Sequence, residues 1–364
     1  MERKSAIPTQ IPGTKRAHHS SQLLVSSGIP GLDDILGGGM PVGTVTVIEE
    51  DMYGTYAKIM LKYFIAEGVV SKHSTFLASQ DASPHEVIRE IPAVIQFDED
   101  RSSDFFKVRA PEEKMKIAFR YSNLPTFEDE DRHIRIGHFF DLTKPMPLTD
   151  IENADIYYWN GYRVENGAST FLNPAYNDLL RQIKDKIKDD KFFLKDNPEK
   201  KTILRISVHS LGSPFWLPTR NPVHSVMDSS RDLNTFIFCL RALVRSALAV
   251  AVITIPSHLY HKNALERCIH SSDISIRLQS FAGTELETNK SLSDYHGFFH
   301  LTKLAPINSF ASKHPGSVEH VFKLRRKKFV IEKLHLPPSF DDSDKKDKEV
   351  ATGCHSASRQ LLEF

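Results

Sequence analysis

Residues 26–58 read SSGIPGLDDILGGGMPVGTVTVIEEDMYGTYAK, and this stretch decides the fold. Its glycine-rich turn precedes Gly43–Ile48 (GTVTVI), a β-branched run that is typical of a buried strand. A loop follows and opens a helix over Tyr53–Val69, where apolar residues recur at helical spacing. His73–Ser79 (HSTFLAS) then predicts a second strand. Strand, helix and strand at this spacing form a βαβ unit, which predicts a parallel sheet with a right-handed crossover.

The same alternation resumes in the second half of the chain. The predicted helices are Pro174–Ile187 and Asp232–Leu248, and the predicted strands are Thr202–Val208, Ala249–Ile255 and Asp273–Phe281. Two strand-like runs, Val321–Leu324 and Lys328–Ile331, flank a basic turn and predict a terminal hairpin. The expected fold class is therefore α/β, with a central, mostly parallel sheet flanked by helices and a C-terminal antiparallel meander or hairpin.

Composition limits the classes of function that the chain can have. Its 364 residues carry a net charge of +1, with 40% hydrophobic and 26% charged residues, as expected for a globular protein with a sizeable core. The near-zero charge argues against a general polyanion binder, although local basic surfaces remain compatible with it. The three cysteines are few and far apart, which indicates a reducing compartment. No apolar run approaches the roughly 20 residues that span a bilayer. We expect no membrane partner and a cytoplasmic and nuclear location.

Polarity and periodicity divide the chain into three parts. Residues 1–24 are polar and aperiodic, which predicts a disordered N-terminal arm. Residues 25–338 are expected to form one domain, with loops or insertions near 124–133, which is acidic, and near 184–201, which is dense in Lys and Asp. Residues 339–364 are polar and aperiodic and predict a flexible tail.

The loop after the Gly43–Ile48 strand stands where a phosphate-binding loop, G-x-x-x-x-G-K-[ST], would stand. Backbone N–H groups of such a loop wrap the phosphates, its Lys neutralises charge and its hydroxyl holds Mg²⁺. Here Glu50 takes the first Gly position, Tyr56 the Lys position and Ala57 the hydroxyl position. Carboxylates beside a polyphosphate cost on the order of 1 to 4 kcal/mol each. The residues of this degenerate phosphate loop are Glu50, Asp51, Gly54, Thr55 and Tyr56.

A second acidic element of phosphate-loop enzymes is also missing. In those enzymes a later strand ends in an Asp that helps to hold Mg²⁺. The matching strand here, Thr202–Val208, ends in His209 and Ser210 instead. A register shift by one residue brings in Thr55 or Lys58, but neither completes the motif. Two independent losses favour a site that does not hydrolyse ATP, and the simplest interpretation is a turn that only joins strand to helix.

Several segments carry a family resemblance. The leader SGIPGLDDILGGGMPVG is similar to the entry of RecA/RadA-type ATPases. The chain also resembles the PAXNEB family over roughly residues 24–338. The matching segments are IEEDMYGTY (48–56), MKIAFRYSNLP (115–125), HFFDLTKPM (138–146), ILRISVHSLGSPFW (203–216) and FVIEKLHLPP (329–338).

The resemblance implies a RecA-like domain without a standard phosphate loop. It implies a hetero-hexameric ring with subunits 5 and 6 of the Elongator complex, which binds tRNA and assists the catalytic subcomplex of subunits 1–3 in modifying the wobble uridine. The iron–sulfur cluster and acetyl-CoA chemistry of that modification belongs to another subunit. The family therefore implies no cofactor and no enzymatic activity for this chain.

Loops after the two central strands would face the pore of such a ring. Counting strands places them at about 210–230, which contains Arg220, and at about 256–263, which contains His258 and Lys262. A His or aromatic platform beside a cation suits unpaired RNA, so Arg220, His258 and Lys262 are the candidate nucleic-acid contacts, with ordinary exposed loops as the alternative. The nearby His and Cys residues lack the paired spacing of a zinc site, and we expect no metal.

Two other functions remain open from the sequence. One is a divergent RecA-like ATPase that uses a relocated cation such as Lys58. The other is a DNA-repair or transcription adaptor on the same fold, since a fold does not fix a function. The missing Lys and hydroxyl argue against the ATPase, whereas only the identity of the partners separates the adaptor from an Elongator subunit.

Overall fold

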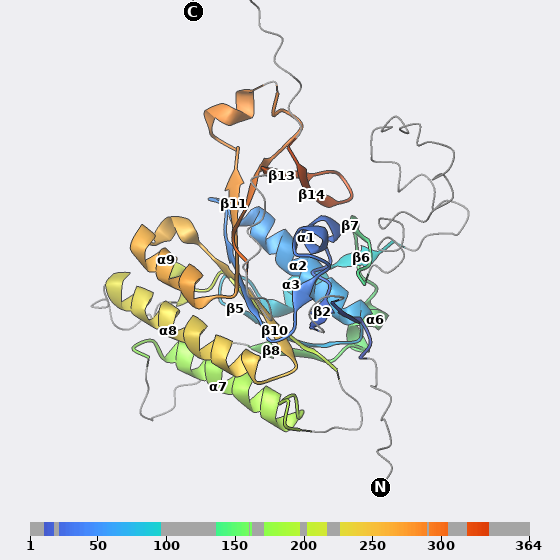
Figure 1. Ribbon diagram of the computed structural model, residues 1–364, viewed down its shortest axis with the longest axis vertical. Helices are drawn as coiled ribbons and strands as arrows, with labels where there is room; N and C mark the ends of the chain where they lie inside the picture. The colour runs from blue at the N-terminus through green and yellow to red at the C-terminus, as the bar shows by residue number, and fades with distance from the viewer. Residues whose placement is uncertain are drawn as a thin grey trace, which may run out of the picture. The chain divides into compact units, whose positions relative to one another are not determined.

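A computed structural model gives the fold of the chain (Figure 1). It describes residues 11–17, 22–95, 136–159, 161, 171–196, 202–216, 226–289, 291–304 and 319–334. All of these belong to one unit that ends at Leu334. No helix within this described part of the chain has the length and apolar character needed to cross a bilayer.

A nine-stranded mixed sheet forms the centre, in the order β14-β13-β12-β11-β4-β10-β9-β5-β8. Its parallel strands are β4 (Val45–Glu49), β5 (Ser74–Ser79), β8 (Ile156–Trp159), β9 (Leu204–His209), β10 (Ala249–Ile255) and β11 (Ile274–Ser280). Strand β10 pairs with β4 on one side and β9 on the other, so two strands separate β4 from β5, its successor in the chain. The order β11-β4-β10-β9-β5 is that of RecA-type domains, which confirms the predicted fold class.

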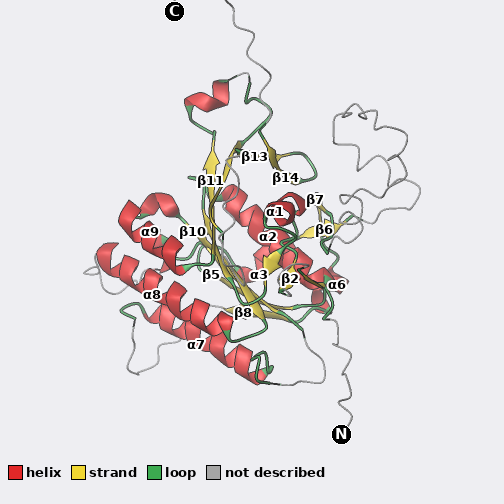
Figure 2. Cartoon of the chain, in the orientation of Figure 1, coloured by secondary structure: helices red, strands yellow, loops and turns green. Residues whose placement is uncertain are grey.

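Helices cover both faces of the parallel part of the sheet (Figures 1 and 2). One face carries α1 (Pro30–Ile35), α2 (Thr55–Val70), α3 (Pro84–Arg89) and α6 (Leu148–Glu152), and the other carries α7 (Pro174–Asp189), α8 (Val226–Arg245) and α9 (Lys262–Ser271). Because successive side chains of a strand point to opposite faces, Ile48 packs in the core under α2 whereas Val47 packs in the core under α7 and α8. Burial on both faces explains the nearly unbroken apolar runs of these strands.

The C-terminal strands extend the sheet in an antiparallel meander, as the sequence predicts. Strand β11 pairs with β12 (Gly297–Lys303), β12 with β13 (His320–Leu324), and β13 with β14 (Phe329–Lys333). The ring of Tyr56, at the start of α2, lies 4.7 Å from that of Phe322, so the meander packs onto the beginning of the helix.

The prediction of a disordered arm over residues 1–24 is wrong for its described part. Strand β1 (Thr14–Arg16) pairs with β2 (Leu23–Val25), which pairs with β3 (Met40–Pro41). The side chain of Ile11 is buried, and the carbonyl of Pro12 is bonded to His73 Nε2 at 2.8 Å. Strands of two or three residues have no measurable period, so composition alone does not distinguish this segment from a disordered one.

The other expected loops have mixed outcomes. The acidic stretch near 124–133 and the tail at 339–364 lie outside the described residues. Residues 184–189, which were assigned to an insertion, continue helix α7, and beyond it Phe193 forms a β-bridge with Ala247. A further two-stranded sheet, β6 (Pro92–Val94) with β7 (Phe140–Pro145), lies beside α2 and α6.

Candidate functional site

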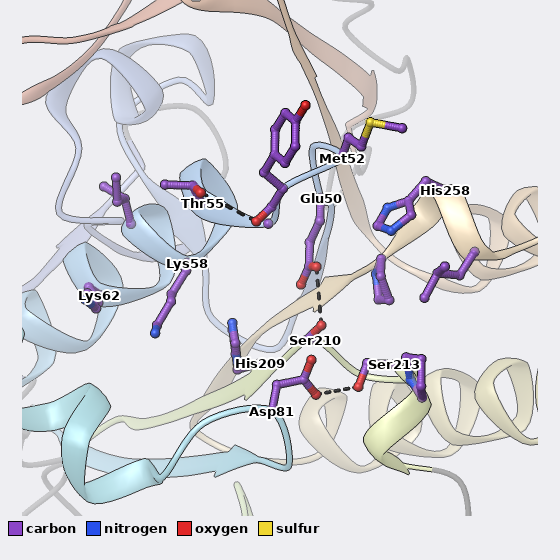
Figure 3. A pocket seen from close by; sticks show the side chains of 16 residues that line it. Glu50, Met52, Thr55, Lys58, Lys62, Asp81, His209, Ser210, Ser213 and His258 are labelled. Carbon is purple, nitrogen blue, oxygen red and sulfur yellow. Dashed lines mark hydrogen bonds between the residues drawn. The ribbon is translucent and has the colours of Figure 1, made fainter. Parts of the chain in front are cut away.

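A cleft of about 570 Å³ opens at the carboxyl edge of the parallel strands (Figure 3). It lies where β4, β5, β9 and β10 end, which is where ligands bind in open α/β sheets. The polar and charged side chains that line it are Glu50, Tyr53, Thr55, Lys58, Lys62, Asp81, His209, Ser210, Ser213 and His258.

The loop after β4 satisfies the N-terminus of α2 with its own carboxylate. Asp51 is buried, its Oδ1 accepts from the N–H of Tyr56 at 3.2 Å, and its Oδ2 accepts from the N–H of Tyr53 at 3.3 Å. Gly54 caps the helix with φ of 65°, a left-handed conformation that glycine adopts at little cost. A helix N-terminus attracts anions, and here the bound anion is a side chain of the same loop.

Tyr56, at the position of the phosphate-loop Lys, packs against the C-terminal meander. Its ring centre lies 4.7 Å from Phe322, 6.4 Å from Phe329 and 6.1 Å from His296. Burial raises the pKa of its phenol above the ordinary value. The residue therefore supplies packing between α2 and the meander and contributes no cation to the cleft.

Glu50 forms part of the floor of the cleft. Its side chain is buried, Oε2 accepts from the Ser210 hydroxyl at 3.3 Å, and Oε1 has no hydrogen-bond partner in the described structure. Burial raises the pKa of Glu50 to about 7, while the hydroxyls of Thr254 and Ser210 hold it lower than burial alone would. A buried carboxylate whose pKa is raised in this way is a candidate functional group.

The loops after β5 and β9 supply the opposite wall. The Asp81 carboxylate accepts a hydrogen bond from the Ser213 hydroxyl, and burial raises the pKa of Asp81. His209 Nδ1 lies 3.0 Å from the Ser79 hydroxyl, and burial lowers the pKa of His209 to about 4, so this imidazole is neutral at pH 7. Among the described residues, no three His, Cys, Asp or Glu side chains are placed to hold a metal ion.

The structure brings most of the candidate residues from the sequence to the cleft or to its loop. Glu50, Gly54, Thr55 and His258 line the cleft, and Asp51 and Tyr56 shape its loop from beneath or behind. Lys262 begins α9 and is exposed but does not line the cleft. Arg220 lies outside the described residues.

Sequence reasoning missed Asp81, Lys62 and Ser213 as lining residues. A signal was available for Asp81, because it follows the predicted strand His73–Ser79 and parallel strands end at the same edge of a sheet. To place Asp81 in the cleft from this signal, one must know that β5 pairs with β9. The sequence alone does not predict that strand order.

Replacing Asp51 with alanine is expected to lower the free energy of unfolding by about 1–2 kcal/mol, because two backbone N–H groups lose their acceptor. Asp51→Asn keeps one acceptor oxygen and is expected to lose about half as much. Urea unfolding followed by circular dichroism measures both. Equal stability of wild type and Asp51→Ala would contradict this role of the carboxylate.

The fold and the cleft define a RecA-type α/β domain whose phosphate-loop position is filled by its own carboxylates. Residues 7–364 match the PAXNEB protein family, and the chain belongs to that family, as the resemblance predicts. It is 38% identical to Elongator complex protein 4 of Xenopus laevis, over 96% of this chain and 90% of that protein. It is also 38% identical to Elongator complex protein 4 of Homo sapiens, over 94% of this chain and 86% of that protein.

A solved structure gives a more distant match. A KaiC-like protein from Pyrococcus horikoshii OT3 is 14% identical, with a TM-score of 0.44, over 85% of this chain and 98% of that one.

Proposed function

We propose that the chain is a non-catalytic subunit of the Elongator complex. In this proposal it forms a hetero-hexameric RecA-like ring with subunits 5 and 6, and the ring binds tRNA and supports wobble uridine modification by subunits 1–3. The observation that carries the non-catalytic role is the carboxylate of Asp51 at the N-terminus of α2, in the place of a nucleotide phosphate. The names of its relatives support membership of the complex.

The chemistry of the cleft supports a subunit without ATPase activity. Phosphate-loop hydrolysis needs free backbone donors, a Lys on the phosphates and a hydroxyl on Mg²⁺. Asp51 occupies the donors, Tyr56 packs onto the meander, and Ala57 is fully buried without a hydroxyl. Lys58 lines the cleft and favours the second candidate, an ATPase with a relocated cation. The buried carboxylate of Glu50 opposes it, because a triphosphate would lie against a like charge.

Two features support the ring and its contact with RNA. A closed head-to-tail ring needs two unlike faces on each subunit, and the cleft with its exposed apolar rim is a candidate for one of them. The segment after β10 exposes His258 in η4 (Ser257–Leu259) and Lys262 at the start of α9, a combination that suits unpaired RNA. We assign the subunit to the cytoplasm and nucleus as part of the same proposal.

Mass photometry of the chain, alone and mixed with subunits 5 and 6, tests the assembly. The expected result is a six-membered species only in the mixture, without ATP turnover that depends on this chain. A monomer that ignores both partners, or that instead recovers DNA-repair proteins from extract, would overturn the proposal. ATP turnover by the hexamer that disappears in Lys58→Ala would establish the ATPase alternative.

The same hexamer tests tRNA binding. Lys262→Ala is expected to weaken binding across all tRNA sequences and to reduce the salt dependence of log K by about 1, as for one lost phosphate contact. Arg326→Ala, in the exposed turn between β13 and β14, is the matched control for a lost surface cation. Equal affinities of wild type and Lys262→Ala would remove Lys262 from the RNA surface.

A further inference from the structure

Large apolar side chains surround the mouth of the cleft. Three line the cleft after strands β4 and β10, and a fourth, in η3 (Pro214–Trp216) after β9, follows the lining residue Pro214 in the chain. Their exposed fractions are 70% for Met52, 64% for Tyr53, 69% for Phe215 and 45% for Leu259. Scattered apolar residues are normal on a protein surface, but an apolar rim around a polar pocket is typical of a protein–protein interface.

Two carboxylates line the same cleft, Glu50 on its floor and Asp81 on the opposite wall. Figure 3 shows Glu50 and Asp81 on either side of Ser210. Glu50 is only 5% exposed, and its Oε1 has no hydrogen-bond partner. No ion pair between described residues neutralises either group, and Lys62, on the α2 wall, binds Glu90 at 2.7 Å instead. Glu50 is buried and Asp81 is exposed, and a cation that reaches the cleft would stabilise the ionised form of both.

These two observations together select the kind of ligand. A phosphate or carboxylate would lie against Glu50 and Asp81 and is disfavoured by like charge. A small free cation would satisfy the acids but would leave Met52, Tyr53 and Phe215 exposed. A basic side chain on a protein surface does both, because its charge enters the cleft while its neighbours cover the rim.

We propose that the cleft receives an arginine or lysine side chain from the neighbouring subunit of the ring, with the apolar rim packed against that subunit. The inference rests on the proposed hexamer and adds to it the face and the chemistry of one contact. Charge complementarity at such a pocket fixes which partner binds and in which register, as well as adding affinity.

Protonation of Glu50 gives this contact a distinctive pH dependence. Burial raises the pKa of Glu50 to about 7, so the free chain holds a proton there at lower pH. A docked cation favours the ionised form, and association should therefore release a proton and strengthen as pH rises through about 7. The other titratable or charged groups around the cleft are Asp51, Lys58, Lys62, Asp81, His209 and His258. Measuring the pH dependence of association for the His258→Gln variant separates the contribution of His258 from that of Glu50.

The test measures dissociation of the purified hexamer on dilution, at pH 6 and pH 8. At pH 8, Glu50→Gln is expected to raise the dissociation constant at least about 30-fold, because the partner's cation loses a buried counter-charge. Asp81→Asn removes a more exposed carboxylate and is expected to raise the dissociation constant about 5-fold. Glu50→Gln should also remove the strengthening between pH 6 and pH 8. Glu266→Gln is the matched control, because Glu266 lies on α9, is exposed and is outside the cleft.

The outcomes separate this inference from the proposed function. If the wild-type chain assembles and neither substitution changes the dissociation constant, the inference is overturned and the proposed ring stands. Failure of the wild-type chain to assemble would overturn the ring itself. Circular dichroism of both variants shows that they are folded before dissociation is compared. Binding of free arginine by the isolated chain, with assembly indifferent to both substitutions, would assign the cleft to a small molecule and also overturn the inference.

Discussion

Replacing Arg205 with leucine is expected to lower the free energy of unfolding by about 3–5 kcal/mol. Arg205 is fully buried on β9, and its Nη1 donates to the carbonyls of Ser26 at 2.9 Å and Phe64 at 3.1 Å. Its Nε donates to His73 Nδ1 at 3.0 Å, and its guanidinium lies 4.7 Å from the centre of the Phe64 ring. Burial lowers the pKa of Arg205 to about 10, with the charges of Glu67 and Asp33 opposing that effect, so the group remains a cation at pH 7.

The loss is large because one side chain joins three parts of the fold. Because Arg205 Nε donates to His73 Nδ1, the other ring nitrogen of His73, Nε2, is the one that bonds the carbonyl of Pro12. This second bond links the N-terminal segment to the sheet. Leucine removes the donor to the Ser26 carbonyl. It also removes one of the positive charges that act on the buried carboxylate of Glu67, which keeps its contact with His138.

Urea unfolding, with hydrogen exchange over residues 11–17, measures this prediction. Arg205→Lys keeps the charge and part of the hydrogen bonding, so it is expected to lose less stability and to remain folded if the leucine variant does not. Arg326→Leu, in the exposed turn between β13 and β14, is the control and should lie within about 0.5 kcal/mol of wild type. Unchanged unfolding of both Arg205 variants would show that the network contributes no net stability.

Arg205 also shows how far sequence reasoning reaches. The run TILRISV (202–208) predicts a buried strand, and the strand is there as Leu204–His209. The pattern does not reveal that its arginine is buried, because the groups that pair with it come from residues 26–73 and meet it only in the folded chain. The strands of the N-terminal segment are too short to show a period, so the sequence does not reveal their pairing either.

Continuous apolar runs were the most reliable signals. Ala249–Ile255 has the predicted bounds, because a central parallel strand is buried on both faces and reads as an unbroken apolar stretch. Strand β8 (Ile156–Trp159) was not predicted, because it lies at the sheet edge, where only Trp159 is buried and the run is short. An edge strand buries fewer apolar side chains and depends more on pairing with its neighbour, and strand pairing cannot be read from a single sequence.

The candidate site was predictable on one side only. The loop after β4 was found because a known motif fixes where each phosphate-binding residue should stand, so Glu50 and Tyr56 were recognised as departures from it. Asp81 belongs to no motif, and its place opposite Glu50 depends on β5 pairing with β9.

Replacing Glu50 with glutamine is expected to raise the free energy of unfolding of the isolated chain at pH 8 by about 3 kcal/mol. The pKa of the folded-state carboxyl is raised from 4.5 to about 7, chiefly by burial. The folded chain therefore holds the proton more tightly than the unfolded chain, and stability falls as pH rises from about 4.5 to about 7. Above that window the chain carries the full cost of a buried charge, which glutamine avoids while keeping a similar shape.

Thermal and urea unfolding at pH 4 and pH 8 measure this effect. The gain should be present at pH 8 and nearly absent at pH 4, where Glu50 is protonated in both states. Glu266→Gln, at an exposed carboxylate of α9, provides the control. A glutamine variant that is less stable than wild type at pH 8 would show that the ionised carboxylate is already satisfied within the chain.

The opposite signs of the two expected effects of Glu50→Gln distinguish a structural from a binding role. A structural carboxylate would destabilise the chain when removed, and any loss of assembly would follow from that loss of stability. We expect instead a more stable isolated chain and a weaker hexamer, because the charge that costs free energy in the chain is the one that the partner's cation neutralises. Stability and assembly that changed in the same direction would remove Glu50 from the interface.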